Sequence, residues 1–344
     1  MTVTRFFKNP VYTENFPDPT VAIQINREGD LEFHAFSTQR RNGESGYIFI
    51  PHIISTDLIH WQKAGSALDD KAIPDMIVQD TPKFWAPEVL QLAEHHWLLY
   101  FNAKLRARKG PQICVAKSPD LGTPFEVVKA PLDDIGQMNS YPFADIDPCP
   151  FRSADGNLYI TYGGGTECPV MIAQLRNDGL ARIPSSQRPL LYPNPAIEAK
   201  QWYEASRIVE FEGQPVLITS GPDARTFYQV RLGVLNEQGR FSQERVIYQG
   251  NDTWDRVGQP VFINLGEDEN DEKNWWALVH GVERKHAYKE GEIYRQLLLE
   301  KVHWKLEEGR WVLTIGEGRP NLAMQEAPRW DPVRVASRIS AGND

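Results

Sequence analysis

The amino-acid sequence predicts an all-β protein folded as a five-bladed β-propeller. Five segments share one format: a polar or small residue, usually beside proline, then an apolar strand, a turn, and a second alternating strand. One position of this format recurs at residues 18, 86, 147, 204 and 259, in steps of 68, 61, 57 and 55 residues. Units of roughly 40–60 residues that hold several short strands are typical of propeller blades. An irregular sandwich with similar hairpins would not produce this near-even spacing.

The first three units are supported by apolar alternation and by turn residues. Their paired strands are expected over 18–23 and 31–37, over 86–92 and 96–101, and over 147–151 and 158–162. Alternation of period two indicates strands with one buried face. Gly29-Asp30 and Asp155-Gly156-Asn157 supply the residue types that tight turns favour.

The last two units follow the same plan. The fourth pairs 204–211 with 214–220, and the fifth pairs 259–264 with 274–280, with 294–304 and 310–315 completing the last blade. The acidic run 266–273 is expected to be a solvated hairpin loop, and the residues after about 320 a loosely packed tail. Residues 1–344 are therefore expected to form a single propeller domain.

Composition excludes several classes of partner. The chain has 344 residues, 37 Lys+Arg and 46 Asp+Glu, which gives a net charge of −9. Without a basic block, nucleic acid and anionic membranes are not expected as partners. No apolar run approaches the ~18–20 residues of a membrane-spanning helix. Ten Trp residues supply flat surfaces that can be buried or offered to a ligand.

Cysteine usage and the N-terminus suggest a compartment. The cysteines lack metal-site spacing and are expected to be buried free thiols; they are Cys114, Cys149 and Cys168. Residues 1–8 lack the apolar core of a secretory signal. A cytoplasmic location is therefore expected, or secretion if a leader was removed.

Three of the five repeated positions are acidic, namely Asp18, Asp147 and Glu204. The innermost strands of a propeller begin at one end of its axis, so these carboxylates are expected to converge there. Crowded carboxylates resist joint ionisation, and a fold has no need of that repulsion. The cluster could divide general acid and base work on a glycosidic bond, or it could hold a hard cation such as calcium. Solvated turn carboxylates are the third interpretation.

Several motifs resemble glycoside hydrolase family 43, which contains β-xylosidases, α-L-arabinofuranosidases and arabinanases on five-bladed propellers. The resemblance rests on segments spread from residue 9 to residue 304: Asn9-Pro10-Val11, Phe16-Pro17-Asp18-Pro19, Ser55–Trp61, Phe84-Trp85-Ala86-Pro87-Glu88-Val89, Ile146-Asp147-Pro148, Tyr203-Glu204-Ala205-Ser206 and Arg295–Trp304. The Trp-Ala-Pro-Glu segment is the most specific of these.

The resemblance implies a role for each acid. Asp18 matches the general base that activates water, and Glu204 matches the general acid that protonates the departing oxygen. Asp147 matches the carboxylate that sets the pKa of the acid and orients it. The family inverts anomeric configuration, which implies base and acid carboxylates roughly 6.5–9.5 Å apart.

Three further residues are candidates for binding substrate. Trp85 could form an aromatic wall for the terminal sugar, or pack between blades. Arg256 could bind sugar hydroxyls or hold Asp147 charged, or pair with Asp255 or Asp252 at the surface. Phe36 could line a subsite, although its place at the end of a strand also fits core packing.

A calcium ion on the propeller axis is a further expectation from the family. Many members carry a histidine near the start of the fifth blade, whereas this chain has Gln259 there. His280, at the end of the next strand, is the second candidate ligand. No cofactor is expected to be required for the chemistry.

The expected activity is an inverting, exo-acting glycosidase that releases xylose or arabinose from xylo-oligosaccharides or arabinoxylan. Insertions at 40–46 and 104–112 could close the pocket at one end. Alternatives are an endo-arabinanase, a fructan-cleaving propeller enzyme and a non-catalytic sugar-binding propeller. Against fructan cleavage, the third blade lacks Arg-Asp-Pro, and Glu167-Cys168-Pro169 only follows a glycine run at the end of a strand.

Overall fold

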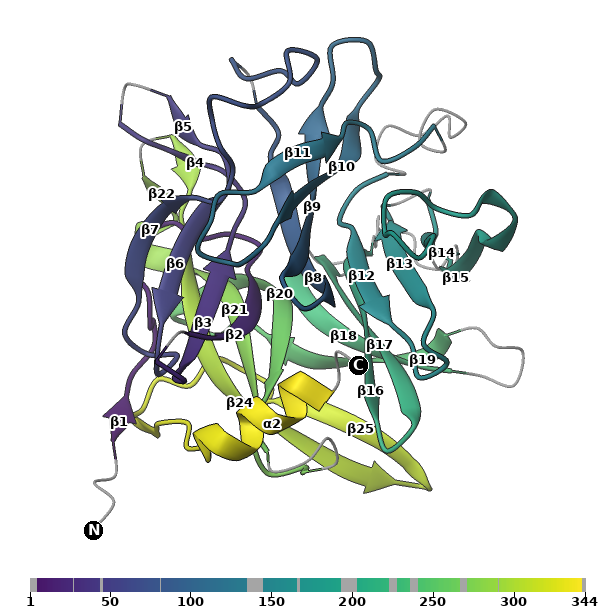
Figure 1. The fold of residues 1–344 in the computed structure, drawn as a ribbon. Coiled ribbons are helices and arrows are strands. Elements are labelled where there is room, and N and C mark those ends of the chain that lie inside the picture. Colours follow the sequence, from purple (N-terminus) through teal and green to yellow (C-terminus); the bar gives the residue numbers. More distant parts are fainter. Residues whose placement is uncertain are drawn as a thin grey trace.

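Five four-stranded antiparallel sheets form the body of the protein in a computed structural model. The structure describes residues 5–26, 28–43, 46–80, 82–134, 145–165, 168–192, 203–222, 228–235, 241–266, 271–289 and 291–341. In each sheet the strands follow one another outward from the centre of the ring, as expected of propeller blades (Figure 1). The fold class predicted from the repeats is confirmed.

Each blade takes one hairpin and two further strands from a continuous stretch of chain. Blade 1 contains β2 (Thr20–Ile25), β3 (Leu31–Phe36), β6 (Pro51–Ser55) and β7 (Gln62–Ser66). Blade 2 contains β8 (Trp85–Ala93), β9 (His96–Lys104), β10 (Pro111–Ser118) and β11 (Glu126–Lys129). Blade 3 contains β12 (Cys149–Arg152), β13 (Leu158–Gly163), β14 (Val170–Gln174) and β15 (Arg188–Leu191).

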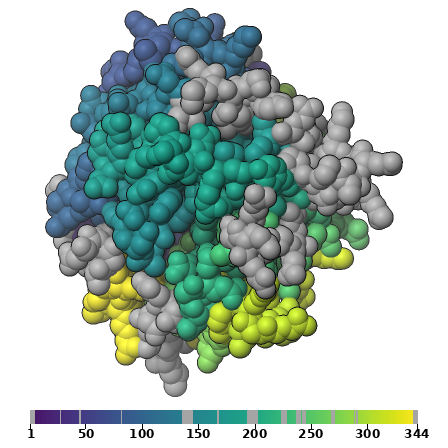
Figure 2. Space-filling view, turned by 90° about the vertical axis from the view of Figure 1, so that its right-hand side faces the viewer, coloured from purple at the N-terminus to yellow at the C-terminus, as the bar shows by residue number. Residues whose placement is uncertain are grey.

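The two remaining blades are longer. Blade 4 contains β16 (Glu204–Phe211), β17 (Gln214–Pro222), β18 (Tyr228–Leu235) and β19 (Phe241–Gln249). Blade 5 contains β20 (Trp254–Asn264), β21 (Trp275–Glu283), β24 (Arg295–Glu307) and β25 (Arg310–Ile315). The strands predicted to complete the fifth blade are those observed. Figure 2 shows blades 3 and 4 from the side, with strands of blade 5 below them. Of the acidic loop, residues 267–270 lie outside the described residues.

The hydrophobic core is divided among the interfaces between neighbouring blades. One buried cluster joins blades 1 and 2, another blades 2 and 3, and others join blades 3 and 4, 4 and 5, and 5 and 1. Each sheet therefore buries both faces, and no single central core exists in the described part of the chain. The axis is left for polar side chains.

The N-terminal segment closes the ring by packing along the last blade. The Val11 N–H donates to the Leu297 carbonyl at 2.9 Å, and the Phe16 N–H donates to the Arg295 carbonyl at 2.7 Å. These bonds deliver the chain to Asp18, immediately before β2. The start of blade 1 is thereby held against blade 5.

The expectation of a loosely packed tail is wrong for the described residues after 320. Strand β26 (Gln325–Glu326) pairs with β1 (Phe6–Phe7), and α2 (Pro332–Ala341) follows it. The Trp330 ring packs edge-on against Phe33, with centroids 5.4 Å apart. Burial of such aromatic and aliphatic groups is sufficient reason for this segment to be ordered.

Two short hairpins stand on the loops at the end of the propeller where the innermost strands begin. They are β4 (Arg40–Arg41) with β5 (Tyr47–Ile48) from blade 1, and β22 (Tyr288–Lys289) with β23 (Glu292–Ile293) from blade 5 (Figure 1). The Glu292 carboxylate accepts from Asn15 Nδ2 at 3.3 Å and from the Arg41 N–H at 3.2 Å, which links the two hairpins. The helices in the described part of the chain are too short or too polar to traverse a lipid bilayer.

Candidate active site

A left-handed backbone residue lies at or just before the start of the innermost strand in blades 1 to 4 and inside β20 in blade 5. The positive φ angles are 54° at Asp18, 42° at Ala86, 50° at Asp147, 52° at Ala205 and 48° at Gln259. In blades 2, 4 and 5 the strand pairing shifts at this point, so an extra residue bulges from the ladder. Non-glycine residues seldom adopt this conformation, and its fivefold recurrence shows that these positions are equivalent.

This equivalence corrects one position of the predicted register. Ala205, not Glu204, corresponds to Asp18 and Asp147. Glu204 stands one residue earlier, at the position that Trp85 occupies in blade 2 and Gly258 in blade 5. The error has a local cause, because blade 4 has Ala205-Ser206 where the other blades have a residue followed by proline.

The N–H groups of the left-handed residues are satisfied by the preceding blade. They donate to Thr38 Oγ1 (from Ala86, 2.8 Å), Asn102 Oδ1 (from Asp147, 2.8 Å), Ser220 Oγ (from Gln259, 2.9 Å) and His280 Nδ1 (from Asp18, 3.1 Å). In blade 4 the Ala205 N–H donates instead to Oδ2 of Asp147, at 2.9 Å. A circle of hydrogen bonds therefore fixes the residues that carry or adjoin the acids.

Asp18 is held as a carboxylate by its neighbours. Arg295 Nη1 donates to its Oδ1 at 2.7 Å, and Thr38 Oγ1 donates to its Oδ2 at 2.7 Å. Burial alone would raise the pKa of Asp18, but the Arg295 charge and the Thr38 hydrogen bond outweigh it and hold that pKa well below its usual range. The side chain keeps 14% of its surface exposed, so it is ionised and still accessible.

His280 is neutral, and its ring accepts a hydrogen bond from the backbone N–H of Asp18. The Asp18 N–H can only donate, so Nδ1 of His280 must accept and the ring proton lies on Nε2. Burial lowers the pKa of His280, which agrees with an uncharged ring. The 3.3 Å approach of Nδ1 to Oδ1 of Asp18 is then a contact and not an ion pair.

Asp147 and Glu204 lie close enough for their negative charges to repel each other. Burial, followed by the charges of Glu204 and Asp18, raises the pKa of Asp147 well above its usual range. The Tyr228 hydroxyl donates to Oε1 of Glu204 at 2.5 Å. Both carboxyl side chains are half-buried, like Asp18. The structure therefore brings the three predicted acids together with one of them firmly ionised and the other two in competition for a proton.

An ion pair crosses the propeller axis one layer below the acids. Arg207 in β16 donates to Glu88 in β8, and Thr20 Oγ1 donates to the other Glu88 oxygen at 2.9 Å. Arg207 Nε also donates to the Pro260 carbonyl at 3.2 Å, and its charge interacts with Cys149. One pair thus contacts all five blades. Glu88, the glutamate of the Trp-Ala-Pro-Glu motif, therefore has a structural role in this ion pair.

The role of Trp85 as an aromatic wall stays a prediction. It occupies the strand position equivalent to Glu204 and is half-buried. The Lys83 ammonium lies 4.7 Å from its ring centroid, a cation–π contact that covers one face of the indole. The opposite face is the one that could meet a sugar.

One predicted binding residue, Phe36, lies in the core, and the role of another, Arg256, stays a prediction. Phe36 is fully buried in the core between blades 1 and 2, where its ring stacks on His52 with centroids 4.5 Å apart. It cannot contact a substrate. Arg256 is exposed, and its backbone N–H donates to Asp255, while the ion pair of Asp255 is made by Arg284. The arginine that touches an acid is Arg295, which sequence reasoning placed in a motif without giving it a role.

The predicted calcium ligands are both on the axial side of blade 5. Gln259 is buried with its N–H bound to Ser220, and His280 Nδ1 is taken by the Asp18 N–H. Over the described ranges, no group of three or more His, Cys, Asp or Glu side chains has an arrangement suited to a metal. The positive charge beside the acids comes from Arg295.

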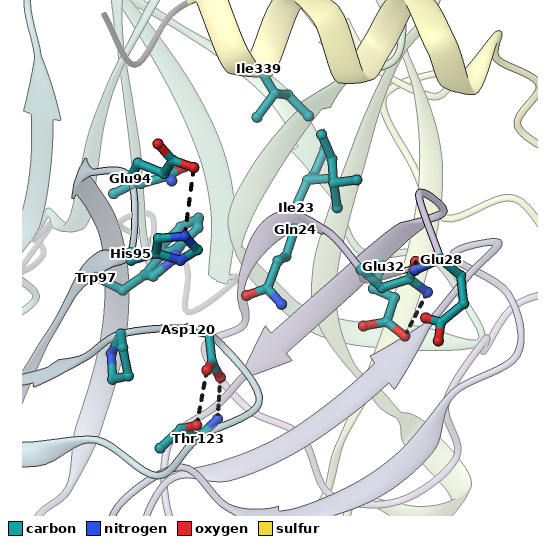
Figure 3. A pocket seen from close by; sticks show the side chains of 14 residues that line it. Ile23, Gln24, Glu28, Glu32, Glu94, His95, Trp97, Asp120, Thr123 and Ile339 are labelled. Carbon is teal, nitrogen blue, oxygen red and sulfur yellow. Dashed lines mark hydrogen bonds and ion pairs between the residues drawn. The ribbon is translucent and has the colours of Figure 1, made fainter.

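A separate cavity of about 800 Å³ lies at the far ends of β2 and β8, away from the three acids (Figure 3). Trp97, Glu94 and Asp120 line it, together with Ile339 from α2. Since the innermost strands run from the acids towards this cavity, it lies on the opposite face of the propeller. It is not the candidate active site.

Comparison with known proteins agrees with the fold and identifies the family. The model of glycosyl hydrolases family 43 matches residues 7–309. A curated relative, an extracellular endo-α-(1→5)-L-arabinanase of Thermotoga petrophila, is 28% identical over 149 residues, which are 35% of this chain and 31% of that relative. This match therefore spans about a third of the relative's length.

Solved structures show the same fold at low sequence identity. A thermostable family-43 glycoside hydrolase superposes with a TM-score of 0.70 at 20% identity, covering 94% of this chain and 100% of the other. A xylan β-1,4-xylosidase from Bacillus halodurans C-125 superposes with a TM-score of 0.65 at 15% identity, covering 94% and 60%. The family match over nearly the whole chain, on a propeller that gathers the three expected acids, shows that the chain belongs to glycosyl hydrolase family 43.

Proposed function

We propose that this protein is an inverting, exo-acting glycosidase that releases xylose or arabinose from xylo-oligosaccharides or arabinoxylan. The observation that carries the proposal is the unequal environment of the acids: Asp18 is bound by Arg295, whereas Asp147 and Glu204 share a buried, repulsive site. Hydrolysis of a glycoside requires two carboxyl groups, one protonated to act as the acid and one ionised to act as the base.

Asp18 acts as the general base. Its lowered pKa favours the carboxylate form, and its side chain keeps 14% of its surface exposed. It takes a proton from a water molecule that attacks the anomeric carbon. Arg295 and Thr38 hold both carboxylate oxygens in place during this step.

Glu204 acts as the general acid. Crowding of Asp147 and Glu204 opposes double ionisation, so the pair shares a proton. Glu204 gives this proton to the departing glycosidic oxygen, and its Oε1 is oriented by Tyr228. Asp147, whose pKa is raised by burial and by the charges of Glu204 and Asp18, shares this proton with Glu204.

Exo action is supported by the walls around the site. The hairpins β4–β5 and β22–β23 stand beside Asp18 and are joined through Glu292. We expect these hairpins and Trp85 to wall a pocket for one terminal sugar rather than an open groove. An arabinanase activity is the second candidate, favoured by the name of the curated relative.

The experiment pairs nitrophenyl β-xylopyranoside with nitrophenyl α-arabinofuranoside, followed by xylobiose and linear arabinan. Release of monosaccharide from chain ends supports the proposal, whereas internal cleavage of arabinan supports the endo-arabinanase. Proton NMR of the first-formed anomer tests inversion, and retention would point to the fructan-cleaving type. Binding of xylobiose without turnover would indicate a sugar-binding propeller.

Calcium remains a proposal for the axis of the propeller, with Gln259 and His280 as the nearest candidates. Equilibrium dialysis against calcium, together with activity before and after chelation, tests it. Unchanged activity and no bound calcium would refute it.

A location in the cytoplasm likewise remains a proposal, which cell fractionation of the native host tests.

A further inference from the structure

Three consecutive glycines end strand β13 directly beside the segment that carries Glu204. A Cβ atom at Gly164 would lie 1.9 Å from the Tyr203 carbonyl oxygen, which no side chain allows. The Gly165 N–H donates to that same oxygen at 2.8 Å. Gly164 and Gly165 therefore fix the backbone that leads into Glu204.

Gly163 has a different relation to the acids. In blades 1, 2, 4 and 5 the equivalent strand position holds Thr38, Asn102, Ser220 and His280, the side chains that accept the left-handed N–H of the next blade. Blade 3 has Gly163 there, with φ of 76° and no side chain. The Ala205 N–H of the next blade therefore lacks the usual acceptor.

Asp147 supplies the missing acceptor. Its Oδ2 accepts the Ala205 N–H at 2.9 Å, one residue beyond Glu204. This bond favours the charged form of Asp147, because an amide N–H stabilises a carboxylate more than a neutral carboxyl. The charged groups that face Asp147 are Glu204 and Asp18, which oppose its ionisation, and Arg295, which favours it.

We propose that Gly163 is a positioning residue: by offering no side-chain acceptor it leaves the Ala205 N–H to Asp147, and this bond orients the Asp147 carboxyl and shifts the shared proton towards Glu204. The inference rests on the proposed function of Glu204 as general acid. Blade 3 differs from the other four blades at the one place where a side chain would compete with Asp147.

The test compares Gly163→Asn with Gly163→Ala. Asparagine tolerates positive φ and is the acceptor that blade 2 uses, whereas alanine adds a Cβ without an acceptor. On xylobiose, G163N should lower kcat about tenfold or more relative to G163A, with KM little changed. On 2,4-dinitrophenyl β-xylopyranoside, which needs no acid, the two variants should agree within about twofold.

Controls separate this effect from strain and from failure of the proposed function. Gly156→Asn changes an exposed glycine with φ of 81° in the same blade and should behave as wild type on both substrates. If G163N does not fold, Gly163→Ser replaces it. Equal losses on both substrates, or equal values for the asparagine and alanine variants, would overturn the inference. A wild-type protein that hydrolyses neither these substrates nor the corresponding arabinofuranosides would contradict the proposed function instead.

A second measurement does not depend on activity. In a protein labelled with ¹⁵N-alanine, the Ala205 amide proton should shift as Asp147 titrates, in wild type and in G163A. This titration should disappear in G163N, because the asparagine side chain accepts the amide. A titration that persists unchanged in G163N would refute the proposed competition.

Discussion

Arg295 and Asp18 link the last blade to the first: Nη1 of Arg295 donates to Oδ1 of Asp18 at 2.7 Å. The two residues are 277 positions apart in the sequence. The pair joins closure of the ring to the chemistry of the site, because the strand that seals the propeller carries the charge that ionises the base.

Replacing Arg295 should move the acid limb of the pH profile. Asp18 must be ionised to act, and Arg295 holds its pKa below the usual range. Without that charge Asp18 binds a proton at higher pH, so activity in Arg295→Met should fall away at a pH higher by about one unit or more. The measurement is kcat/KM against pH. Arg256→Met, which changes an exposed arginine, should leave the limb in place, and an unmoved limb in R295M would contradict the role.

The two acids should respond differently to removal. Asp18→Ala should abolish hydrolysis of every substrate, because no other group is placed to deprotonate water. Glu204→Gln should lower activity on xylobiose by about 10²–10⁴-fold and spare dinitrophenyl glycosides, whose leaving group needs no proton. Steady-state rates on both substrates give the contrast. Equal losses in E204Q would show that Glu204 is not the acid.

The sequence was sufficient to predict the fold and the convergence of Asp18, Asp147 and Glu204, since both depend on a repeat that is visible in one dimension. It failed where the position depends on pairing between strands. Glu204 was placed one residue out of register because blade 4 lacks the proline that marks the other blades. Phe36 was misread because alternation does not distinguish the axis from the interface between two sheets. Arg295 reaches Asp18 only through strand β24, so no local signal identifies it.

Replacement of Phe36 should affect stability, whereas replacement of Trp85 should affect substrate binding. Phe36→Ala should lower the free energy of unfolding by about 3–5 kcal/mol, because the ring is fully buried. Its KM should not change in the protein that remains folded. Trp85→Ala should leave stability nearly unchanged and raise KM. Urea unfolding and steady-state kinetics of both variants test this, and a normal KM in W85A would remove Trp85 from the site.

The ion pair across the axis should be costly to break from one side. Burial raises the pKa of Glu88, although Arg207 and Thr20 oppose the shift, so its charge depends on its partner. Glu88→Gln leaves the Arg207 charge uncompensated and should cost about 3–5 kcal/mol of stability. The double variant Glu88→Met with Arg207→Met should recover part of that loss. Thermal unfolding of the two variants tests this prediction. A double variant that is no more stable than E88Q would show that the pair does not act as a unit.

A buried carboxyl outside the site should give the protein a measurable dependence of stability on pH. Glu300, in β24, accepts from Asn9 at 2.9 Å, from the Asn321 N–H at 2.9 Å and from Tyr248 at 3.2 Å, all through Oε1, while its buried Oε2 has no partner. Burial raises the pKa of Glu300 to about 7, against an ordinary value of 4.5. The unfolded chain therefore loses this proton at lower pH than the folded protein does.

The sign of the pH dependence of stability follows from the higher pKa of Glu300 in the folded protein. Between about pH 4.5 and pH 7 the unfolded state is ionised while the folded state keeps the proton, so the stability of the wild-type protein falls as pH rises through this window. Glu300→Gln keeps an oxygen for the three donors and has no proton to lose. It should match wild type near pH 4 and exceed it at pH 8 by up to about 3 kcal/mol. Urea unfolding at both pH values measures this difference, with the exposed Glu308→Gln as the control. A constant difference between E300Q and wild type at the two pH values would mean that Glu300 does not titrate in this window.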